Sequence, residues 1–158
     1  MKKKSNKIIF LTIYLILILI FYFFTLRSGD ESSKDSSITA NIVLAILKFF
    51  TFNKIEFDYE IIHHITRKMV GHYGYNLIIG LFGFLTVYSF RGIGNYTLII
   101  SIFLGLVIAI SGELLQFIPA NRAPSVVDML INFFGEATGV LLPYVIILYR
   151  SNKNKNII

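Results

Sequence analysis

Long apolar runs separated by short polar segments restrict this chain to few folds. The first run, Ile8 to Leu26, holds nineteen mostly apolar residues, which at about 1.5 Å per residue is enough to cross a hydrocarbon core of about 30 Å. With 55% apolar residues and a mean hydropathy of +0.69, the chain is too apolar for a water-soluble domain of this size. We predict one all-α domain over residues 1–158, a polytopic transmembrane bundle whose four spanning helices lie at about residues 8–26, 70–90, 96–118 and 126–149.

The first apolar run has a competing interpretation as a cleaved signal peptide. Four lysines lie within residues 1–7, just before it, as they would in a signal peptide. The run is long, however, and Phe23 to Arg27 is a poor cleavage site because it lacks small residues at the required spacing. We therefore predict that this span is retained as a membrane anchor.

Three short segments separate the first span from the second. Residues 29–37 (GDESSKDSS) are polar and turn-rich, which predicts a solvated linker. Residues 38–52 are apolar but too short for a span, so we predict a short amphipathic helix at the membrane interface, with a helix buried against the bundle as the alternative. Residues 55–61 alternate apolar and acidic side chains, which predicts either an extended segment or the start of a helix capped by Asp58.

Polar and small residues recur at helical spacing in the last three spans, which places each set on one face of its helix. These sets are Lys68, His72, Asn76 and Gly80; Ser101, Gly105, Ala109 and Glu113, with Gln116 on the same side; and Asp128, Asn132, Gly135, Glu136 and Gly139. Gly135 and Gly139 form a GxxxG pair, which predicts close helix packing. Ser125 and Asp128 match a capping box at the start of the fourth span.

The distribution of basic residues predicts a multi-pass protein of the cell membrane with both termini in the cytoplasm. The segments that this orientation places inside hold no acidic residue, whereas basic residues on the other side are diluted by acids. The basic residues predicted to lie inside are Lys2, Lys3, Lys4, Lys7, Arg91, Arg150, Lys153 and Lys155. In this orientation the polar ends of the last three spans meet near the outer surface, with Glu136 deeper in the bilayer.

The segment from Glu113 to Gly139 resembles the signature of the VanZ-like family. The matching positions are Glu113, Gln116, Arg122, Asp128, Asn132, Gly135 and Gly139. Arg67 and Lys68, followed by His72 and Tyr73, resemble an RK and His-aromatic motif of that family, although three residues separate Lys68 from His72 where many members have two. The resemblance covers about residues 64–142. It implies a small membrane protein of the cell envelope of mostly Gram-positive bacteria, in a family named for a component linked to resistance to the glycopeptide teicoplanin.

We predict that the polar cluster binds an anionic ligand. The predicted binding residues are Arg67, Lys68, His72, Glu113, Gln116, Arg122, Asp128 and Asn132. The arginines and the lysine can donate hydrogen bonds to the phosphate of a lipid or a cell-wall precursor, and a guanidinium matches two phosphate oxygens. A purely structural alternative is that Arg122 pairs with Asp128 or Glu113 and only neutralises charge at the membrane surface.

These residues favour a binding protein. We expect it to contact membrane lipids, to bind an anionic lipid or a lipid-linked cell-wall precursor, and to contribute to glycopeptide resistance. One alternative is a membrane-embedded enzyme acting on a lipid-linked envelope substrate, with His72, Glu113 and Asp128 as candidate acid–base residues. Another is a proton path that uses Glu136. We predict no metal site, because His63 and His64 are adjacent and point apart on a helix, and no cofactor. We also predict no nucleic-acid partner, because the basic residues form no face interleaved with aromatic residues.

Overall fold

Five long helices make up the computed structural model, which describes residues 2–155 and contains no strand in that range. Four of them are long and apolar enough to cross a membrane, over residues 6–25, 59–91, 95–115 and 126–153. The all-α class and the four candidate spans are thus confirmed. The elements are α1 (Lys2–Thr25), α2 (Gly29–Phe50), a continuous helix formed by α3 (Tyr59–Thr66), η1 (Arg67–Gly74) and α4 (Tyr75–Arg91), then α5 (Asn95–Leu115) and α6 (Val126–Lys155).

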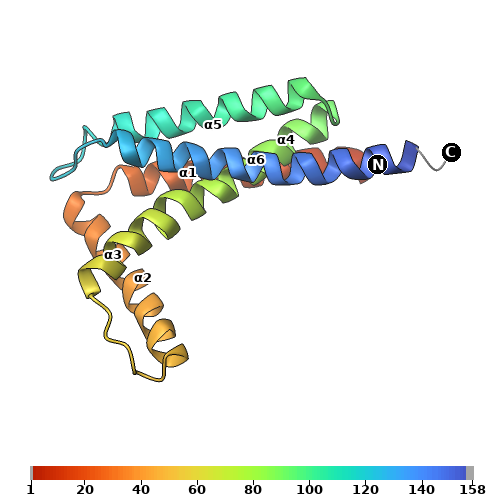
Figure 1. Ribbon diagram of the computed structural model, residues 1–158. Helices are drawn as coiled ribbons and strands as arrows, with labels where there is room; N and C mark the ends of the chain where they lie inside the picture. The colour runs from red at the N-terminus through yellow and green to blue at the C-terminus, as the bar shows by residue number, and fades with distance from the viewer. Residues whose placement is uncertain (1, 156–158) are drawn as a thin grey trace.

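The four candidate spans form one bundle, in which α1, α4, α5 and α6 lie alongside one another and the two ends of the chain lie at the same end (Figure 1). Two small clusters of buried apolar side chains fill its interior, one around Ile79 and Ile108 and one around Phe84 and Val140. Gly139 and Gly135 lie directly against the backbone of the helix that contains η1 and α4. This is how small residues let two helices approach closely.

Helix α2 corrects the prediction of a linker over residues 29–37, because the helix begins at Gly29 and not at residue 38. Ser28 caps it: the Ser28 hydroxyl accepts from the Glu31 N–H at 3.3 Å, while the Glu31 carboxylate accepts from the Ser28 N–H at 3.2 Å. Such a reciprocal capping box satisfies two backbone donors that a helix start leaves open. The local cap thus turns a polar, turn-rich segment into the first turns of a helix.

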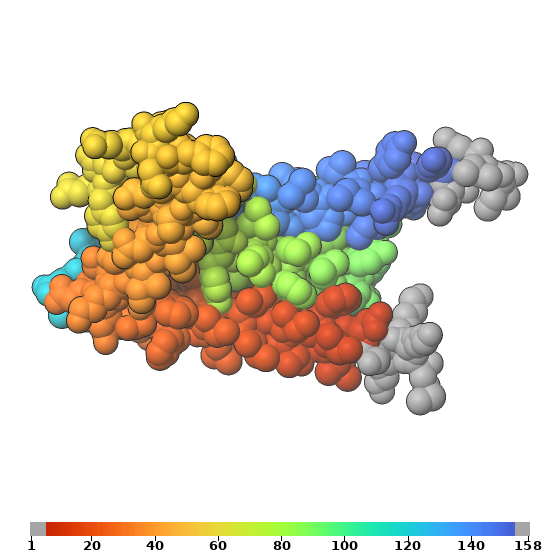
Figure 2. Space-filling model, turned by 90° about the horizontal axis from the view of Figure 1, so that it is seen from below, coloured from red at the N-terminus to blue at the C-terminus, as the bar shows by residue number. Residues whose placement is uncertain are grey.

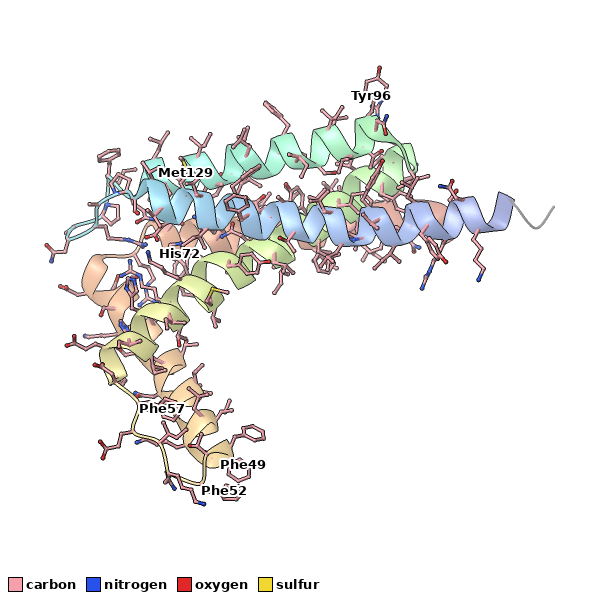
Figure 3. All side chains as sticks on the ribbon, viewed as in Figure 1. Phe49, Phe52, Phe57, His72, Tyr96 and Met129 are labelled. Atoms are coloured by element: carbon pink, nitrogen blue, oxygen red, sulfur yellow. The ribbon has the colours of Figure 1, made fainter. Side chains whose placement is uncertain are left out.

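Helices α2 and α3 stand out from the bundle at the end opposite the two termini, as the space-filling view shows (Figure 2). The far tip of this projection carries exposed phenylalanines, among them Phe49 and Phe52, at 76% and 82% exposure (Figure 3). Helix α2 is not among the four candidate spans. The exposed aromatic tip agrees with an interfacial position for α2, which stays a prediction.

The second span starts before the predicted residue 70 and contains a π-helical segment. Asp58 caps a helix, accepting from the N–H groups of Glu60 and Ile61 at 2.8 and 3.3 Å, so the helical alternative for this segment is correct from Tyr59 onward. The helix then continues without a break into α4, but residues 67–74 are π-helical. Such wide turns are rare inside α-helices and are frequent at functional sites.

The third span ends at Leu115, three residues earlier than predicted. Tighter turns follow, in which the N–H groups of Gln116, Phe117 and Ile118 each donate to the carbonyl three residues earlier. The loop then passes over the start of α2, where the Gly29 N–H donates to the Ala120 carbonyl at 3.0 Å. The α5–α6 loop is therefore tied to the start of α2.

Candidate functional site

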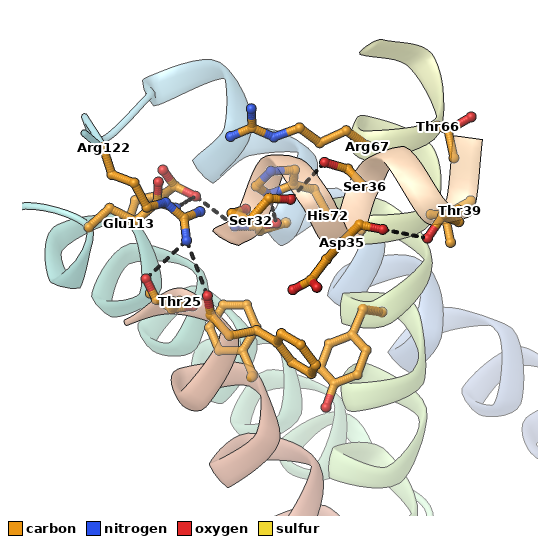
Figure 4. Close-up of a pocket in the computed structure, with 17 residues that line it drawn as sticks. Thr25, Ser32, Asp35, Ser36, Thr39, Thr66, Arg67, His72, Glu113 and Arg122 are labelled. Atoms are coloured by element: carbon orange, nitrogen blue, oxygen red, sulfur yellow. Dashed lines mark hydrogen bonds between the residues drawn. The ribbon is translucent and has the colours of Figure 1, made fainter. Parts of the chain in front are cut away.

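A cavity of about 360 Å³ lies where α2, η1, the end of α1 and the α5–α6 loop meet (Figure 4). Six of the eight predicted binding residues line it: Arg67, His72, Glu113, Gln116, Arg122 and Asn132. The other two, Lys68 and Asp128, do not line the cavity but contact each other behind His72. The predicted residues therefore come together from three helices and a loop, and their binding role remains a prediction.

Glu113 is the central acceptor of the site. It is only 3% exposed, and its carboxylate accepts from the side-chain nitrogens of Gln116 and Asn132 at 2.9 and 3.1 Å and from the Ser125 N–H at 3.1 Å. The capping box predicted at Ser125 is therefore only half formed. The Ser125 hydroxyl accepts from the Asp128 N–H at 3.2 Å, but Glu113 replaces Asp128 as the acceptor for the Ser125 N–H.

The hydrogen bonds around Asn132 fix the orientation of each side chain. The Asn76 side-chain nitrogen donates to the His72 carbonyl at 2.7 Å, and the same nitrogen donates to the Asn132 side-chain oxygen at 2.9 Å. The Asn132 nitrogen consequently faces the Glu113 carboxylate. Since the Asn132 oxygen can only accept, Nδ1 of His72, 3.0 Å away, must carry a proton. The ring of His72 is held through Asn132 by a buried carboxylate.

Asp128 lies on the other side of the His72 ring. Its carboxylate is 3.5 Å from Nζ of Lys68 and 3.9 Å from Nε2 of His72. Lys68 and His72 are thus brought to the same acidic partner despite the π-helical turns between them. His72 and Asp128, one of the predicted catalytic combinations, thus lie next to each other without a hydrogen bond between them, and their catalytic role stays a prediction.

Arg122 does not form the ion pair that the purely structural alternative expects. Among residues 2–155 no ion pair within 4.0 Å joins it to Asp128 or Glu113. Its guanidinium instead donates to the carbonyls of Phe24, Thr25 and Arg27 at 3.1, 3.1 and 3.4 Å. The Phe24 and Thr25 carbonyls belong to the last turn of α1, where they have no partner within the helix and carry the negative end of its dipole, so a cation is stable there.

A second cation, Arg67, lies near Arg122 and repels its positive charge. Burial lowers the pKa of the Arg122 guanidinium, and the positive charge of Arg67 lowers it further, although Glu113 and Asp128 act in the opposite direction. Nε of Arg122 is buried and has no hydrogen-bond partner within the described chain. The cavity wall thus holds two arginines whose charges are not directly neutralised.

One wall of the cavity was not foreseen from the sequence. Ser32, Asp35, Ser36 and Thr39 of α2 line it, because the predicted linker is helical. Their spacing of three and four residues is the signal that marks one face of a helix. Asp35 is already paired, with a guanidinium nitrogen of Arg27 at 2.6 Å. This wall therefore adds hydroxyl groups and no unpaired charge.

Glu136 lies apart from the cavity, in the middle of the bundle. It is 1% exposed, and one carboxyl oxygen has no hydrogen-bond partner in the described chain. Gly105 of α5 makes room for it: a Cβ atom there would lie 2.7 Å from the Glu136 Oε2. Among the described residues no group of three or more His, Cys, Asp or Glu side chains could hold a metal ion.

Comparison with known proteins places the whole bundle in one family. The family model described as VanZ/LLP1 matches residues 10–148. The chain belongs to the VanZ/LLP1 family. The match begins within α1, whereas the motif resemblance covers only about residues 64–142, so the first span and α2 are also part of the VanZ/LLP1 region. No curated protein and no solved structure matches this VanZ/LLP1 chain.

Proposed function

We propose that this multi-pass membrane protein binds the anionic headgroup of a membrane lipid or of a lipid-linked cell-wall precursor in the cavity. The observation that carries the proposal is the pair Arg67 and Arg122. Both line the cavity, and among residues 2–155 neither forms an ion pair within 4.0 Å with a carboxylate. Cations that are partly removed from water require a partner of opposite charge. A phosphate supplies it and matches the planar fork of a guanidinium.

The rest of the cavity fits a lipid better than a free phosphate. Phe21, Phe24, Val70 and Tyr75 line it together with the arginines, and Phe24 and Val70 are exposed. Apolar side chains next to a cationic wall match a molecule with a charged headgroup and hydrocarbon chains. Hydroxyl groups on α2 can contact a glycerol or sugar headgroup.

The distribution of basic residues supports an outward-facing cavity, because it predicts cytoplasmic termini. The α5–α6 loop and the start of α2, which contribute to the cavity wall, lie at the end of the bundle opposite the termini (Figure 1). A protein that binds envelope lipids or precursors on the outer side of the membrane can change how glycopeptides reach their targets. This is the route by which we propose that the protein contributes to glycopeptide resistance, the phenotype for which the VanZ-like family is named.

Native mass spectrometry of the purified chain with phosphatidylglycerol and with zwitterionic phosphatidylcholine tests the proposal. The informative variant is Arg67→Gln, because the Arg67 side chain makes no hydrogen bond or ion pair in the described chain, whereas Arg122 also holds the end of α1. A charge-assisted hydrogen bond contributes about 1.5–3 kcal/mol, so we expect phosphatidylglycerol to bind about 10- to 100-fold more weakly. Arg91→Gln, at the opposite end of the bundle, is the matched control. Equal binding by both variants would refute the proposal.

A membrane-embedded enzyme is the second candidate, favoured by the chain of hydrogen bonds from Glu113 through Asn132 to His72. A ring held in this way by a carboxylate is suited to acid–base chemistry. Incubation with lipid-linked envelope precursors, followed by mass spectrometry of the lipids, tests it. A product that the wild type forms and Glu113→Gln does not form, while both bind the lipid, would support an enzyme.

A further inference from the structure

Of the two ring nitrogens of His72, Nε2 makes no hydrogen bond among residues 2–155. Nδ1 is held as a donor to Asn132 at 3.0 Å, so in the neutral ring Nε2 bears a lone pair. The Asp128 Oδ2 faces it at 3.9 Å. Two acceptors that face each other repel, and a proton on Nε2 turns that repulsion into attraction.

Charges of both signs surround the His72 ring in the empty site. Arg67 and Arg122 line the same cavity as the ring (Figure 4), and their positive charges oppose a third one. Asp128 favours it, but its carboxylate is shared with Lys68. Glu113 acts through Asn132, and the remaining acid of the cavity wall, Asp35 on α2, is paired with Arg27.

An anion on the two arginines changes this balance. Its negative charge cancels the charges that oppose protonation and leaves Asp128 to stabilise the imidazolium. We infer that His72 takes up a proton when the anion binds, so that the imidazolium becomes the third positive group of the site. This inference rests on the proposed function and adds to it a proton-coupled mode of binding for phosphate-bearing lipids.

The coupling must act in both directions. If the bound anion favours a proton on His72, then a proton on His72 favours the anion by the same factor. The affinity therefore increases as the pH falls through the titration range of the ring, by at most about tenfold per pH unit when one proton is taken up. Asn132 and Glu113 are positioning residues in this scheme, since they fix which ring nitrogen is free.

Calorimetric titration of the full-length protein in detergent with phosphatidylglycerol tests this coupling. A phosphodiester does not titrate between about pH 5.5 and 8, whereas a histidine does, so a pH dependence belongs to the protein. Titrations at one pH in buffers of different ionisation enthalpy count the protons taken up. We expect uptake approaching one proton per lipid and several-fold tighter binding at the acidic end of the range.

Three variants separate His72 from other histidines and from a folding defect. His72→Gln should bind with an affinity that does not depend on pH and without proton uptake, whereas the exposed His64→Gln should behave as the wild type. Asp128→Asn should bind at least as tightly at about pH 8, because it removes a negative charge from the site, yet should take up fewer protons. This last variant keeps the inference testable if His72→Gln is unstable.

The outcomes distinguish the two proposals. Lipid binding without proton uptake, or uptake that His72→Gln retains, overturns the role of His72 and leaves the anion site standing. No preference of the wild type for phosphatidylglycerol over phosphatidylcholine overturns both.

Discussion

Replacement of Gly139 by alanine is the sharpest test of how the bundle that carries the cavity is packed. A Cβ atom at this position meets the Leu77 carbonyl oxygen first, and it also lies 2.7 Å from the Leu81 nitrogen. That second distance is about 0.7 Å short of the 3.4 Å at which ordinary contact begins. Both obstacles belong to the backbone of α4, so no side-chain rotation can relieve them, and α4 and α6 must move apart.

The expected loss of stability in Gly139→Ala follows from the rigidity of the backbone atoms that the new methyl group meets. Overpacking in a tight interior costs about 1–3 kcal/mol, and a clash with backbone should reach the upper end of that range, about 3 kcal/mol. Gly71 provides the matched control, because a Cβ atom there meets nothing within 4 Å. Gly71→Ala should be neutral, or more stable by up to about 1 kcal/mol, since alanine is the better helix former.

Unfolding of the detergent-solubilised protein by titration with sodium dodecyl sulfate measures the change in stability of both variants. The chain has nine tyrosines and no tryptophan, so tyrosine fluorescence reports the loss of packing while the helices persist. We expect the midpoint to fall for Gly139→Ala and to stay or rise for Gly71→Ala. Equal midpoints for the two variants would show that α4 and α6 are not packed as closely as described.

Three other perturbations have defined outcomes. Asn132→Leu should destabilise the protein by about 3 kcal/mol in the same titration, because it leaves several buried polar groups without partners at about 1–3 kcal/mol each; a neutral effect would contradict the described network. The hydrogen bond from the Ser28 N–H lowers the pKa of the Glu31 carboxyl in the folded chain. The carboxylate of Glu31 therefore stabilises the start of α2 above the unfolded pKa, and this stabilisation is lost as the pH falls through the folded pKa. Amide hydrogen exchange at the start of α2 should become faster over that pH range, and the change should be smaller in Ser28→Ala. In the cysteine-free chain, Asn121→Cys should react with an impermeant maleimide on intact cells and Asn152→Cys should not; the reverse pattern would invert the proposed orientation.

The spans and the composition of the site could be predicted from the sequence, because both depend on local periodicity. Apolar runs of sufficient length give the spans, and residues repeated every four positions, such as Ala109 with Glu113 or Asp128 with Asn132, share a helix face wherever the helix packs. The start of α2 was also encoded locally. Ser28 and Glu31 have the spacing of a capping box, a signal that the polar composition of residues 29–37 concealed.

The partners of Arg122 could not be predicted, because they depend on tertiary structure. Its acceptors are carbonyls at the end of α1, almost one hundred residues earlier in the chain, and no sequence pattern shows which helix end a loop will cover. The π-helical turns of residues 67–74 also have no clear sequence signature. Lys68 and His72 were expected on one face for the right reason, yet their shared partner Asp128 could be identified only from the packing of α6.

The contact of Arg122 with the carbonyls of Phe24, Thr25 and Arg27 makes the end of the first span part of the candidate site and not only a membrane anchor. The hydroxyls of Tyr22 and Tyr75 fasten α1 to Ser111 of α5 and to the α4 helix at 2.7 and 2.9 Å. A shortened form without residues 2–25 would still contain every motif residue of the later spans. It would nevertheless lack the Phe24 and Thr25 carbonyls that accept from Arg122 and the Phe21 and Phe24 side chains that line the cavity. We therefore expect that trimming the first hydrophobic segment removes the lipid binding proposed for the cavity.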